Sequence, residues 1–289
     1  MVKSREAFRG VRDLLLQAGV PDAAFDAGVV MELAAGRDWR WREEPLTGGE
    51  QARLSELAQR RAAREPLQYL AGRWPFLDFE LQVGPGVLVP RADTELLCET
   101  GARLLAGKPE PAVLDLCAGS GCVGLGLKRL VPGARVTALE KSPEAFHWLQ
   151  KNAASALPGS STGAPALRAV QGDVFGFEAQ LAPGGLDLIL ANPPYVTEAE
   201  LALLAPELSF EPREALYAPG EGLAFYRHIA PAYQPALAPG GWLAFEIGWQ
   251  QGAAVQQLLL AAGYQNVKCR QDLSGNDRVV LGQKTEIDL

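Results

Sequence analysis

Residues 113–121 decide the fold, and they read Val-Leu-Asp-Leu-Cys-Ala-Gly-Ser-Gly, an apolar stretch followed by a glycine-rich turn. Residues 113–116 have the length and apolar character of a buried strand, and a helical pattern follows at 122–130. Glycines between a strand and a helix allow a sharp turn and let a ligand approach the backbone closely. This order is typical of α/β folds that bind nucleotides, although any such fold can use a glycine turn for purely structural reasons.

Strand and helix patterns alternate along the chain from residue 111 onward. The expected strands are 113–116, 135–140, 167–170, 186–191, 242–247, 267–271 and 278–281. The expected helices are 122–130, 142–156, 224–237 and 250–261, with a loop of small residues at 159–165. Such alternation predicts a mostly parallel sheet with helices on both faces. Since the last two strands are too close for a helical crossover, one strand should be antiparallel.

The first part of the chain has a different, helical pattern. Apolar residues recur every three or four positions in segments that end near Gly19, Gly36 and Arg64. Arg60, Arg61 and Arg64 are expected on a solvated face of the third helix. Residues 68–76 and 79–83 are aromatic and β-branched, which favours a hairpin. We therefore predict a helical domain at 1–66, a hairpin linker at 67–90 and an α/β domain at 91–289.

The composition of the chain excludes several classes of protein. The 289 residues, 48% of them hydrophobic, are enough for a sizeable core. No apolar run reaches the roughly 18–20 residues of a membrane span, and the charged start does not resemble a secretory signal. Four cysteines do not make a disulfide framework, which favours the cytoplasm. The net charge of −7 argues against a protein that binds the phosphate backbone of nucleic acids.

An acidic residue, Glu140, ends the strand that follows the glycine turn. A carboxylate about 20 residues after such a turn can accept hydrogen bonds from both hydroxyls of a ribose. The turn has neither the dinucleotide pattern G-x-G-x-x-G nor the Lys-Ser/Thr of a P-loop. Asp115 before the glycines would repel a phosphate and suits a cationic or amino-bearing ligand. This combination favours S-adenosylmethionine over NAD or ATP.

A second motif, Asn192-Pro193-Pro194-Tyr195, directly follows the strand expected at 186–191. Open α/β folds bind their ligands at the carboxyl ends of strands. Two prolines remove backbone donors and leave carbonyl acceptors. The side-chain oxygen of Asn192 and a proline carbonyl can together accept both hydrogens of a planar NH2 group, with the Tyr195 ring against its plane. An ordinary proline-rich turn is the structural alternative.

The Asn-Pro-Pro-Tyr motif resembles the signature of methyltransferases that act on planar amide or amino nitrogens. Over nearly the whole chain, the sequence resembles one branch of these enzymes, the release-factor glutamine methyltransferases. The similar stretches are residues 89–95, 115–121, 192–196, 210–216 and 246–250. The motif alone does not separate this branch from adenine-N6 DNA methyltransferases. The Phe-Glu-Pro-Arg-Glu-Ala-Leu segment at 210–216 and the helical N-terminal domain favour the protein-modifying branch.

The resemblance implies a fold and an activity. The fold would be a Rossmann-like class I methyltransferase domain, with a mostly parallel seven-stranded sheet and one antiparallel strand, preceded by a substrate-recognition domain. The activity would be methyl transfer from S-adenosylmethionine to the side-chain amide nitrogen (N5) of the glutamine in the Gly-Gly-Gln motif of peptide chain release factors. S-adenosylhomocysteine would be the second product, and no metal would be needed.

The expected partners are peptide chain release factors, without direct contact to nucleic acid or membrane, and the expected state is a cytoplasmic monomer. Three alternatives stay open. The chain could methylate a glutamine of a ribosomal protein, or adenine in DNA. It could also be a non-catalytic donor-binding or assembly protein, which the intact Asn-Pro-Pro-Tyr motif disfavours.

The resemblance also assigns residues to the site. The residues expected to contact the donor are Asp115, Cys117, Ala118, Gly119, Ser120, Gly121, Glu140, Asp173, Val174 and Asn192. The expected catalytic residues are Asn192, Pro193 and Tyr195, and together with Pro194 they would hold the substrate glutamine. Pro90 and Arg91 are candidates for the wall of the site.

The sequence departs from the family pattern at two of these positions. Cys117 stands where many members carry glycine, and the turn tolerates it without strain if its φ is negative. Val174 stands where some members place an aromatic residue beside the adenine. The resemblance therefore does not carry adenine stacking over to this position.

Overall fold

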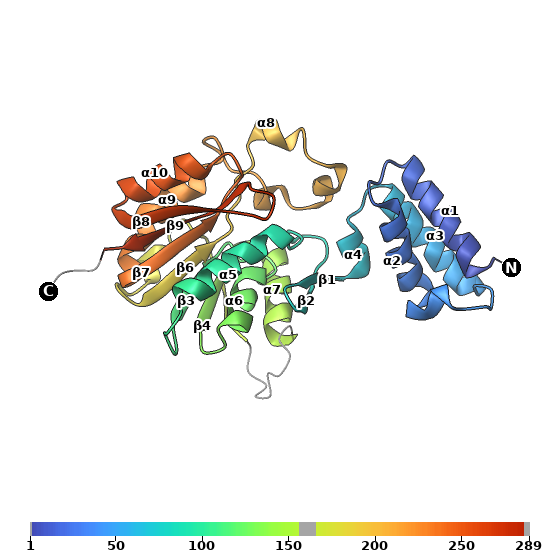
Figure 1. Cartoon of the computed structure of the whole chain (residues 1–289), viewed down its shortest axis with the longest axis horizontal. Helices are drawn as coiled ribbons and strands as arrows, with labels where there is room; N and C mark the ends of the chain where they lie inside the picture. The colour runs from blue at the N-terminus through green and yellow to red at the C-terminus, as the bar shows by residue number, and fades with distance from the viewer. Residues whose placement is uncertain (1, 156–165, 286–289) are drawn as a thin grey trace. The chain divides into compact units, whose positions relative to one another are not determined.

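The chain forms two compact units in the computed structural model, which describes residues 2–155 and 166–285 (Figure 1). The first unit comprises Met1–Arg73 and Ala205–Phe210, and the second comprises Trp74–Leu204 and Glu211–Leu289. A short segment from late in the sequence is therefore part of the first unit. The small-residue loop expected at 159–165 lies outside the described residues.

The first unit is built from helices that pack through apolar faces. Its elements are α1 (Ser4–Gln17), α2 (Ala23–Ala35), the 3-10 helix η1 (Arg37–Arg40), α3 (Gly48–Ala62), α4 (Leu67–Ala71) and η4 (Pro206–Phe210). Helix α1 buries Ala7, Val11 and Leu15, which lie one helical turn apart on one face. A capping box between Thr47 and Glu50 starts α3, since each side chain satisfies a backbone amide of the other.

Two arginines expected on a solvated helix face lie in an ion-pair cluster of the first unit instead. The side chain of Arg61 is only 6% exposed, and its Nε donates to Asp26 at 2.7 Å. Arg61 and Arg64 both bind Glu207 of the Ala205–Phe210 segment. The expectation is therefore wrong for both residues, because their acidic partners lie far away in the sequence. Arg60, with a 44% exposed side chain, does face solvent.

The second unit contains a seven-stranded sheet in the order β5-β4-β3-β6-β7-β9-β8. The strands are β3 (Ala112–Leu116), β4 (Arg135–Glu140), β5 (Arg168–Gln171), β6 (Leu186–Ala191), β7 (Leu237–Glu246), β8 (Tyr264–Gln271) and β9 (Asp277–Lys284). Strand β9 runs antiparallel to both β7 and β8, and the remaining pairs are parallel. The predicted mostly parallel sheet with one antiparallel strand is confirmed.

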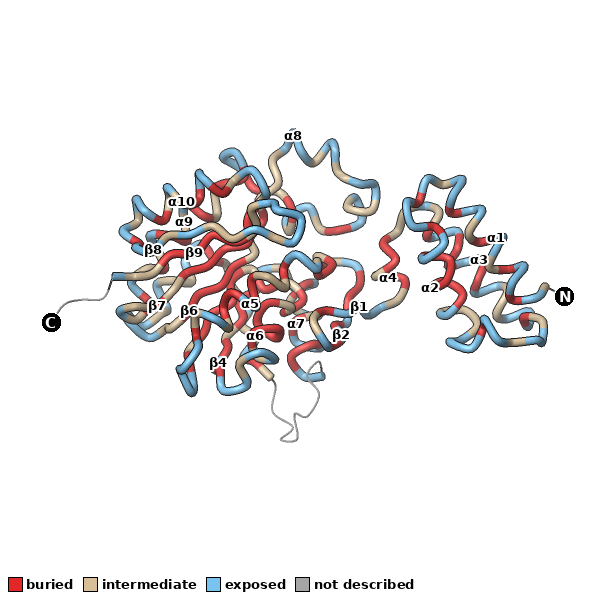
Figure 2. The backbone as a smooth tube through the Cα atoms, in the orientation of Figure 1, coloured by how far each residue is buried: buried red, intermediate tan, exposed pale blue. Residues whose placement is uncertain are grey.

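Helices cover both faces of this sheet (Figure 1). They are α5 (Glu95–Leu104), α6 (Cys122–Leu130) and α7 (Pro143–Ser155) on one face, and α9 (Ala224–Tyr233) and α10 (Gly252–Ala261) on the other. Consecutive residues of β3 point to opposite faces, so Val113 packs in the first core and Leu114 in the second. Both faces have an apolar core, and Figure 2 shows the central strands largely buried, whereas the edge strands β5 and β8 are mostly intermediate or exposed.

The remaining elements refine the sequence-based expectations. They are the hairpin strands β1 (Arg73–Phe76) and β2 (Phe79–Gln82), the helix α8 (Glu198–Leu201), and the 3-10 helices η2 (Ala92–Thr94), η3 (Phe177–Gln180), η5 (Arg213–Ala215) and η6 (Gln234–Ala236). Residues 67–71 form α4 where a strand was expected. Phe76 and Phe79 of the hairpin are buried in the core of the second unit. Within the described ranges, no helix is long and apolar enough to cross a membrane.

Candidate active site

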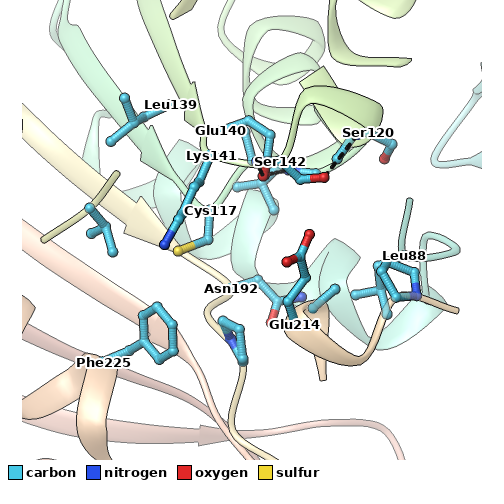
Figure 3. A pocket seen from close by; sticks show the side chains of 18 of the residues that line it. Leu88, Cys117, Ser120, Leu139, Glu140, Lys141, Ser142, Asn192, Glu214 and Phe225 are labelled. Atoms are coloured by element: carbon cyan, nitrogen blue, oxygen red, sulfur yellow. Dashed lines mark hydrogen bonds between the residues drawn. The ribbon is translucent and has the colours of Figure 1, made fainter. Parts of the chain in front are cut away.

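The two motifs meet at one edge of the sheet in the second unit. Leu116, the last residue of β3, pairs with Leu139 of β4 on one side and with Ala191 of β6 on the other. The glycine turn, Glu140 and the Asn-Pro-Pro-Tyr motif therefore all begin at the same edge. A cleft of about 350 Å³ opens there (Figure 3). Its size is typical of sites for small ligands.

The glycine turn, Cys117–Gly121, makes the floor of the cleft through an unusual backbone. Gly119 and Gly121 have φ of 54° and 84°, and a Cβ on Gly121 would lie 2.7 Å from Leu149. Cys117 also has a positive φ, of 58°. The condition of a negative φ is therefore not met, and a side chain occupies a left-handed position that favours glycine. The thiol lines the cleft, and burial raises its pKa well above the ordinary value.

Glu140 ties the turn to the neighbouring strand. Its Oε2 accepts a hydrogen bond from the Gly119 amide at 2.8 Å, and its Oε1 accepts one from the Ser142 amide at 2.7 Å. Burial raises the pKa of Glu140, and these backbone bonds oppose the rise. Each carboxylate oxygen has a further lone pair, so Glu140 can still accept two hydroxyl donors from the cleft.

Asp115 lies beneath the turn and does not line the cleft. The residue is fully buried, and its Oδ2 accepts a hydrogen bond from the Gly124 amide in the first turn of α6 at 2.8 Å. Its Oδ1 has no hydrogen-bond partner among the described residues. Burial raises the pKa of Asp115 to about 8. The carboxyl is therefore largely protonated at neutral pH and holds the turn against α6.

The loop after β5 brings Asp173, Val174 and Phe175 to the cleft, where Asp173 meets Lys141 from the loop after β4. Asp173 forms an ion pair with Lys141 at 2.8 Å. Burial raises the pKa of Asp173, but Lys141 and the Phe175 amide outweigh it, so the net pKa is lowered. The Val174 side chain lines the cleft, and its carbonyl accepts a hydrogen bond from Tyr233 at 2.8 Å.

Two phenylalanines provide the aromatic surface that Val174 lacks. The rings of Phe175 and Phe225 have centroids 5.2 Å apart, and both residues line the cleft. Figure 3 shows Phe225 on the side of the cleft opposite Glu140. Their positions follow from the fold, because Phe225 lies in α9, far from the turn in sequence. The pattern of the turn therefore gave no signal for this residue.

The Asn-Pro-Pro-Tyr motif is fixed by backbone hydrogen bonds on its far side. The amides of Tyr195 and Val196 both donate to the Leu216 carbonyl, at 3.2 and 2.8 Å. The Nε2 of Gln251 donates to the Tyr195 carbonyl at 3.1 Å. Asn192 and Pro194 line the cleft, whereas Pro193 and Tyr195 do not. Burial raises the pKa of Tyr195 to about 12, so its hydroxyl stays protonated.

The segment 211–217 closes the remaining side of the cleft. Glu211 accepts a hydrogen bond from the Val89 amide at 3.0 Å and forms an ion pair with Arg91. Pro90 and Arg91, the expected walls, line the cleft as a result. Glu214 also lines it, and Figure 3 shows this carboxylate facing the same space as Asn192.

Most of the predicted site residues come together around this one cleft. Those that line it are Cys117, Ala118, Gly119, Ser120, Glu140, Asp173, Val174, Asn192 and Pro194. The others, Asp115, Gly121, Pro193 and Tyr195, are not among the lining residues. Sequence reasoning missed several lining residues, namely Thr94, Lys141, Phe175, Glu214, Tyr217 and Phe225. Lys141 and Phe175 adjoin predicted site residues, and Thr94 and Glu214 lie in the family-like stretches 89–95 and 210–216. No local signal existed for Tyr217 and Phe225.

Comparison with known proteins places the chain in a family. Residues 6–72 match the family model of the PrmC N-terminal domain, and residues 93–228 match that of the Methyltransferase small domain. The release factor glutamine methyltransferase of Geobacter sulfurreducens is 37% identical over 284 residues, which cover 96% of each chain. The enzyme of that name from Burkholderia pseudomallei is 38% identical over 276 residues, or 93% of this chain and 94% of its own.

A solved structure supports the fold of the second unit. A methyltransferase from Pyrococcus furiosus has a TM-score of 0.50 at 18% sequence identity, covering 72% of this chain and 89% of its own. At that identity the likeness concerns the fold alone. The sequence relatives carry more information, because they extend over almost the full length of both chains. The chain belongs to the release factor glutamine methyltransferase family.

Proposed function

We propose that this protein transfers a methyl group from S-adenosylmethionine to the side-chain amide nitrogen of the glutamine in the Gly-Gly-Gln motif of peptide chain release factors. The observation that carries the proposal is the position of Asn192 at the edge of a cleft that also contains Glu140 and the glycine turn. A donor cleft and an acceptor for a planar NH2 group thus share one space. The family membership of the chain supports the choice of substrate.

The cleft suits S-adenosylmethionine in shape and charge. Glu140 has free lone pairs for the ribose hydroxyls, and the Gly119 region allows close approach of the methionine portion. Glu140, Asp173 and Glu214 line the same space, so the cleft has acidic groups for a ligand with a sulfonium and an ammonium group. Phe175 and Phe225 offer an aromatic surface for the adenine.

The substrate amide would be held by acceptors rather than by a base. When bound, S-adenosylmethionine supplies a methyl group activated by the positive charge on sulfur. The Asn192 side-chain oxygen and the Pro193 carbonyl accept the two amide hydrogens and aim the nitrogen at the methyl carbon. Alignment of this kind can contribute several kcal/mol, about 7–11 in ideal cases.

The chemical step balances without an added reagent. A bond forms between the amide nitrogen and the methyl carbon as the carbon–sulfur bond breaks, and its electron pair goes to sulfur. The nitrogen then loses one proton to water. Acceptors at Asn192 and Pro193 stabilise the positive charge that develops on the nitrogen. No strong base is required in this scheme.

We extend the proposal to the rest of the molecule. Residues 1–66 act as the substrate-recognition domain, residues 67–90 as the linker and residues 91–289 as the methyltransferase domain. The protein works as a monomer in the cytoplasm, with the release factor as its macromolecular partner and without direct contact to nucleic acid.

A labelling experiment tests the substrate. The protein is incubated with radiolabelled S-adenosylmethionine and, separately, a release factor, its Gly-Gly-Glu variant, ribosomal proteins and duplex DNA. Label on the release factor alone, located by peptide mass spectrometry to the glutamine, supports the proposal. Label on DNA or on a ribosomal protein would replace it with one of the alternative activities. Calorimetry with S-adenosylmethionine separately reports donor binding.

A further inference from the structure

A buried carboxyl group lies at the end of β7, and the proposed chemistry does not use it. Glu246 is 2% exposed and does not line the cleft. Its Oε2 atom has no hydrogen-bond partner among the described residues. An unsatisfied buried carboxyl is costly, because burial disfavours the charged form. Such a group at the edge of a candidate active site requires an explanation.

Glu246 lies beside Asn192 and Thr94 at the edge of the sheet. The Nδ2 of Asn192 donates a hydrogen bond to the Thr94 hydroxyl oxygen at 3.4 Å. Ala191 of β6 pairs with Phe245 of β7, so Asn192 and Glu246 follow at neighbouring strand ends. The side chains of Thr94 and Asn192 both lower the pKa of the Glu246 carboxyl. The three residues come from η2, from the loop after β6 and from β7. Thr94 and Asn192 line the cleft, so Glu246 supports them from behind.

The chemistry of these groups fixes which end of the Asn192 amide faces the cleft. An ionised carboxyl only accepts hydrogen bonds, so it attracts the NH2 end of an amide and the proton of a hydroxyl. The oxygen of Asn192 is then free to face the cleft. A protonated carboxyl can donate instead, and it competes for that oxygen. An Asn192 amide turned by half a revolution would present donors to the substrate NH2 group.

We propose that Glu246 is a positioning residue, which in its ionised form holds Asn192 through Thr94 with the amide oxygen toward the cleft. This inference rests on the proposed function, because it assigns that oxygen the role of accepting the substrate amide. Glu246 itself touches neither the donor nor the substrate. Its ionisation is therefore linked to methyl transfer through the orientation of one side chain.

The surroundings of Glu246 make this ionisation occur near neutral pH. Burial raises the pKa of Glu246 to about 7, and Thr94, Asn192 and Arg278 oppose the rise. The charged and titratable groups that face Glu246 are Asp93 from η2, Arg278 from β9, Tyr195 from the loop after β6, Tyr226 from α9, Cys98 from α5 and Cys122 from α6. The pKa values of both tyrosines and both cysteines are raised, so these four groups stay protonated at neutral pH.

The first experiment measures kcat with a release factor and saturating S-adenosylmethionine between pH 6 and pH 8. The ionised fraction of Glu246 rises about tenfold over this range, so kcat of the unmodified protein should rise about tenfold. Glu246→Gln should remove this step and lower kcat at pH 8 at least about twofold, because a neutral amide no longer selects one of the two orientations of Asn192. The KM for S-adenosylmethionine should stay within about twofold.

Two further variants distinguish the positioning of Asn192 by the Glu246 carboxyl from a general disturbance of the end of β7. Tyr226→Phe removes the hydrogen bond from the Tyr226 hydroxyl to the Glu246 main-chain carbonyl, which is 3.0 Å long, and leaves the carboxyl intact. This variant should keep the pH step. Thr94→Val breaks the connection without altering the charge, and it should lower kcat as Glu246→Gln does. A pH step that persists in Glu246→Gln would overturn the inference.

A second readout does not depend on methyl transfer. The spectra are recorded on 15N-labelled protein without ligands. The side-chain amide resonances of Asn192 are assigned as those that are missing from the spectrum of Asn192→Asp. Their chemical shifts should titrate near pH 7 in the unmodified protein and in Tyr226→Phe, but not in Glu246→Gln. Shifts that do not titrate would refute the positioning role. If the shifts titrate and no release factor is methylated, the proposed function fails while the link between Glu246 and Asn192 stands.

Discussion

Arg64 and Glu207 are joined by two hydrogen bonds across 143 positions of sequence. The Nε of Arg64 donates to Oε1 of Glu207 at 2.8 Å, and its Nη2 donates to Oε2 at 2.7 Å. Arg61 donates to the same Oε1 at 2.7 Å. The carboxylate of Glu207 is thus shared by two guanidinium groups of the first unit, which holds the segment Ala205–Phe210 in that unit.

Glu207→Gln should therefore loosen the Ala205–Phe210 segment. Removing one partner of a largely buried ion pair leaves the other charges uncompensated, at a cost of about 3 kcal/mol. Hydrogen exchange of the amides in this segment and urea denaturation would measure the loss. Glu198→Gln is the matched control, because its pair with Arg213 is exposed and should contribute less than about 1 kcal/mol. Equal effects of the two variants would contradict the prediction.

The same carboxylate predicts a loss of stability in acid. Burial raises the pKa of Glu207, but the hydrogen bonds from Arg64 and Arg61 outweigh it and lower the pKa to about 2. Because the folded pKa lies below the unfolded value of about 4.5, the stabilisation is present above pH 4.5 and is lost as the pH falls toward 2. Denaturation between pH 5 and pH 2 should show a smaller decline in Glu207→Gln than in the unmodified protein.

Asp115 should make the protein less stable as the pH rises, which is opposite to the effect of Glu207. Burial raises its pKa from 3.8 to about 8, so the folded state keeps a proton that the unfolded chain releases. Stability is then highest below pH 4 and falls as the pH rises toward 8, by up to about 1.4 kcal/mol per pH unit. Thermal denaturation at pH 5 and pH 8 would test this. Asp115→Asn should flatten the dependence, and an unchanged slope would show that Asp115 is ionised in the fold.

The left-handed backbone at Cys117 predicts a difference in stability between a glycine and an alanine variant. A φ of 58° is unfavourable for a residue with a Cβ, and both cysteine and alanine carry that atom. Cys117→Gly should therefore be about 1 kcal/mol more stable than Cys117→Ala. The two free energies of unfolding, measured in urea, give the comparison directly, since the thiol is absent from both variants. A more stable alanine variant would be inconsistent with the left-handed backbone.

Phe225 should contribute to donor binding if the adenine packs on the aromatic pair. Phe225→Ala would remove one of two rings whose centroids lie 5.2 Å apart. An aromatic contact of this kind contributes about 0.5–1.5 kcal/mol, which corresponds to a roughly twofold to tenfold weaker Kd for S-adenosylmethionine. Calorimetry would measure it, with Phe210→Ala as a control outside the cleft lining. Unchanged affinity would place the adenine elsewhere.

Local sequence patterns predicted the elements that carry the motifs. Helix α6 and strands β4 and β6 begin and end where the apolar runs and glycines indicated. Strand β7 was expected from Trp242 but begins at Leu237. Its first half contains Pro239 and two glycines, which are unfavourable in isolated strands and are tolerated here beside a register shift. Pairing with β6 outweighs the local propensity of these residues.

The site was predictable only where its residues adjoin a motif. Glu140 and Asn192 each end a strand, so the topology alone brings them to one edge. Glu246 also ends a strand, but its relation to Asn192 and Thr94 depends on the packing of three separate elements. Glu211 reaches the Val89 amide across 122 positions. Contacts of this kind are set by tertiary packing, for which a single sequence carries no periodic signal.

The late segment of the first unit has a consequence for the order of biosynthesis. Translation completes residues 1–73 long before residue 207 is made, and at ordinary elongation rates the delay is on the order of 10 s. During this time Arg61 still has Asp26, but Arg64 and Arg61 both lack the carboxylate of Glu207. The N-terminal unit of a nascent chain therefore remains incomplete until much of the methyltransferase unit has left the ribosome.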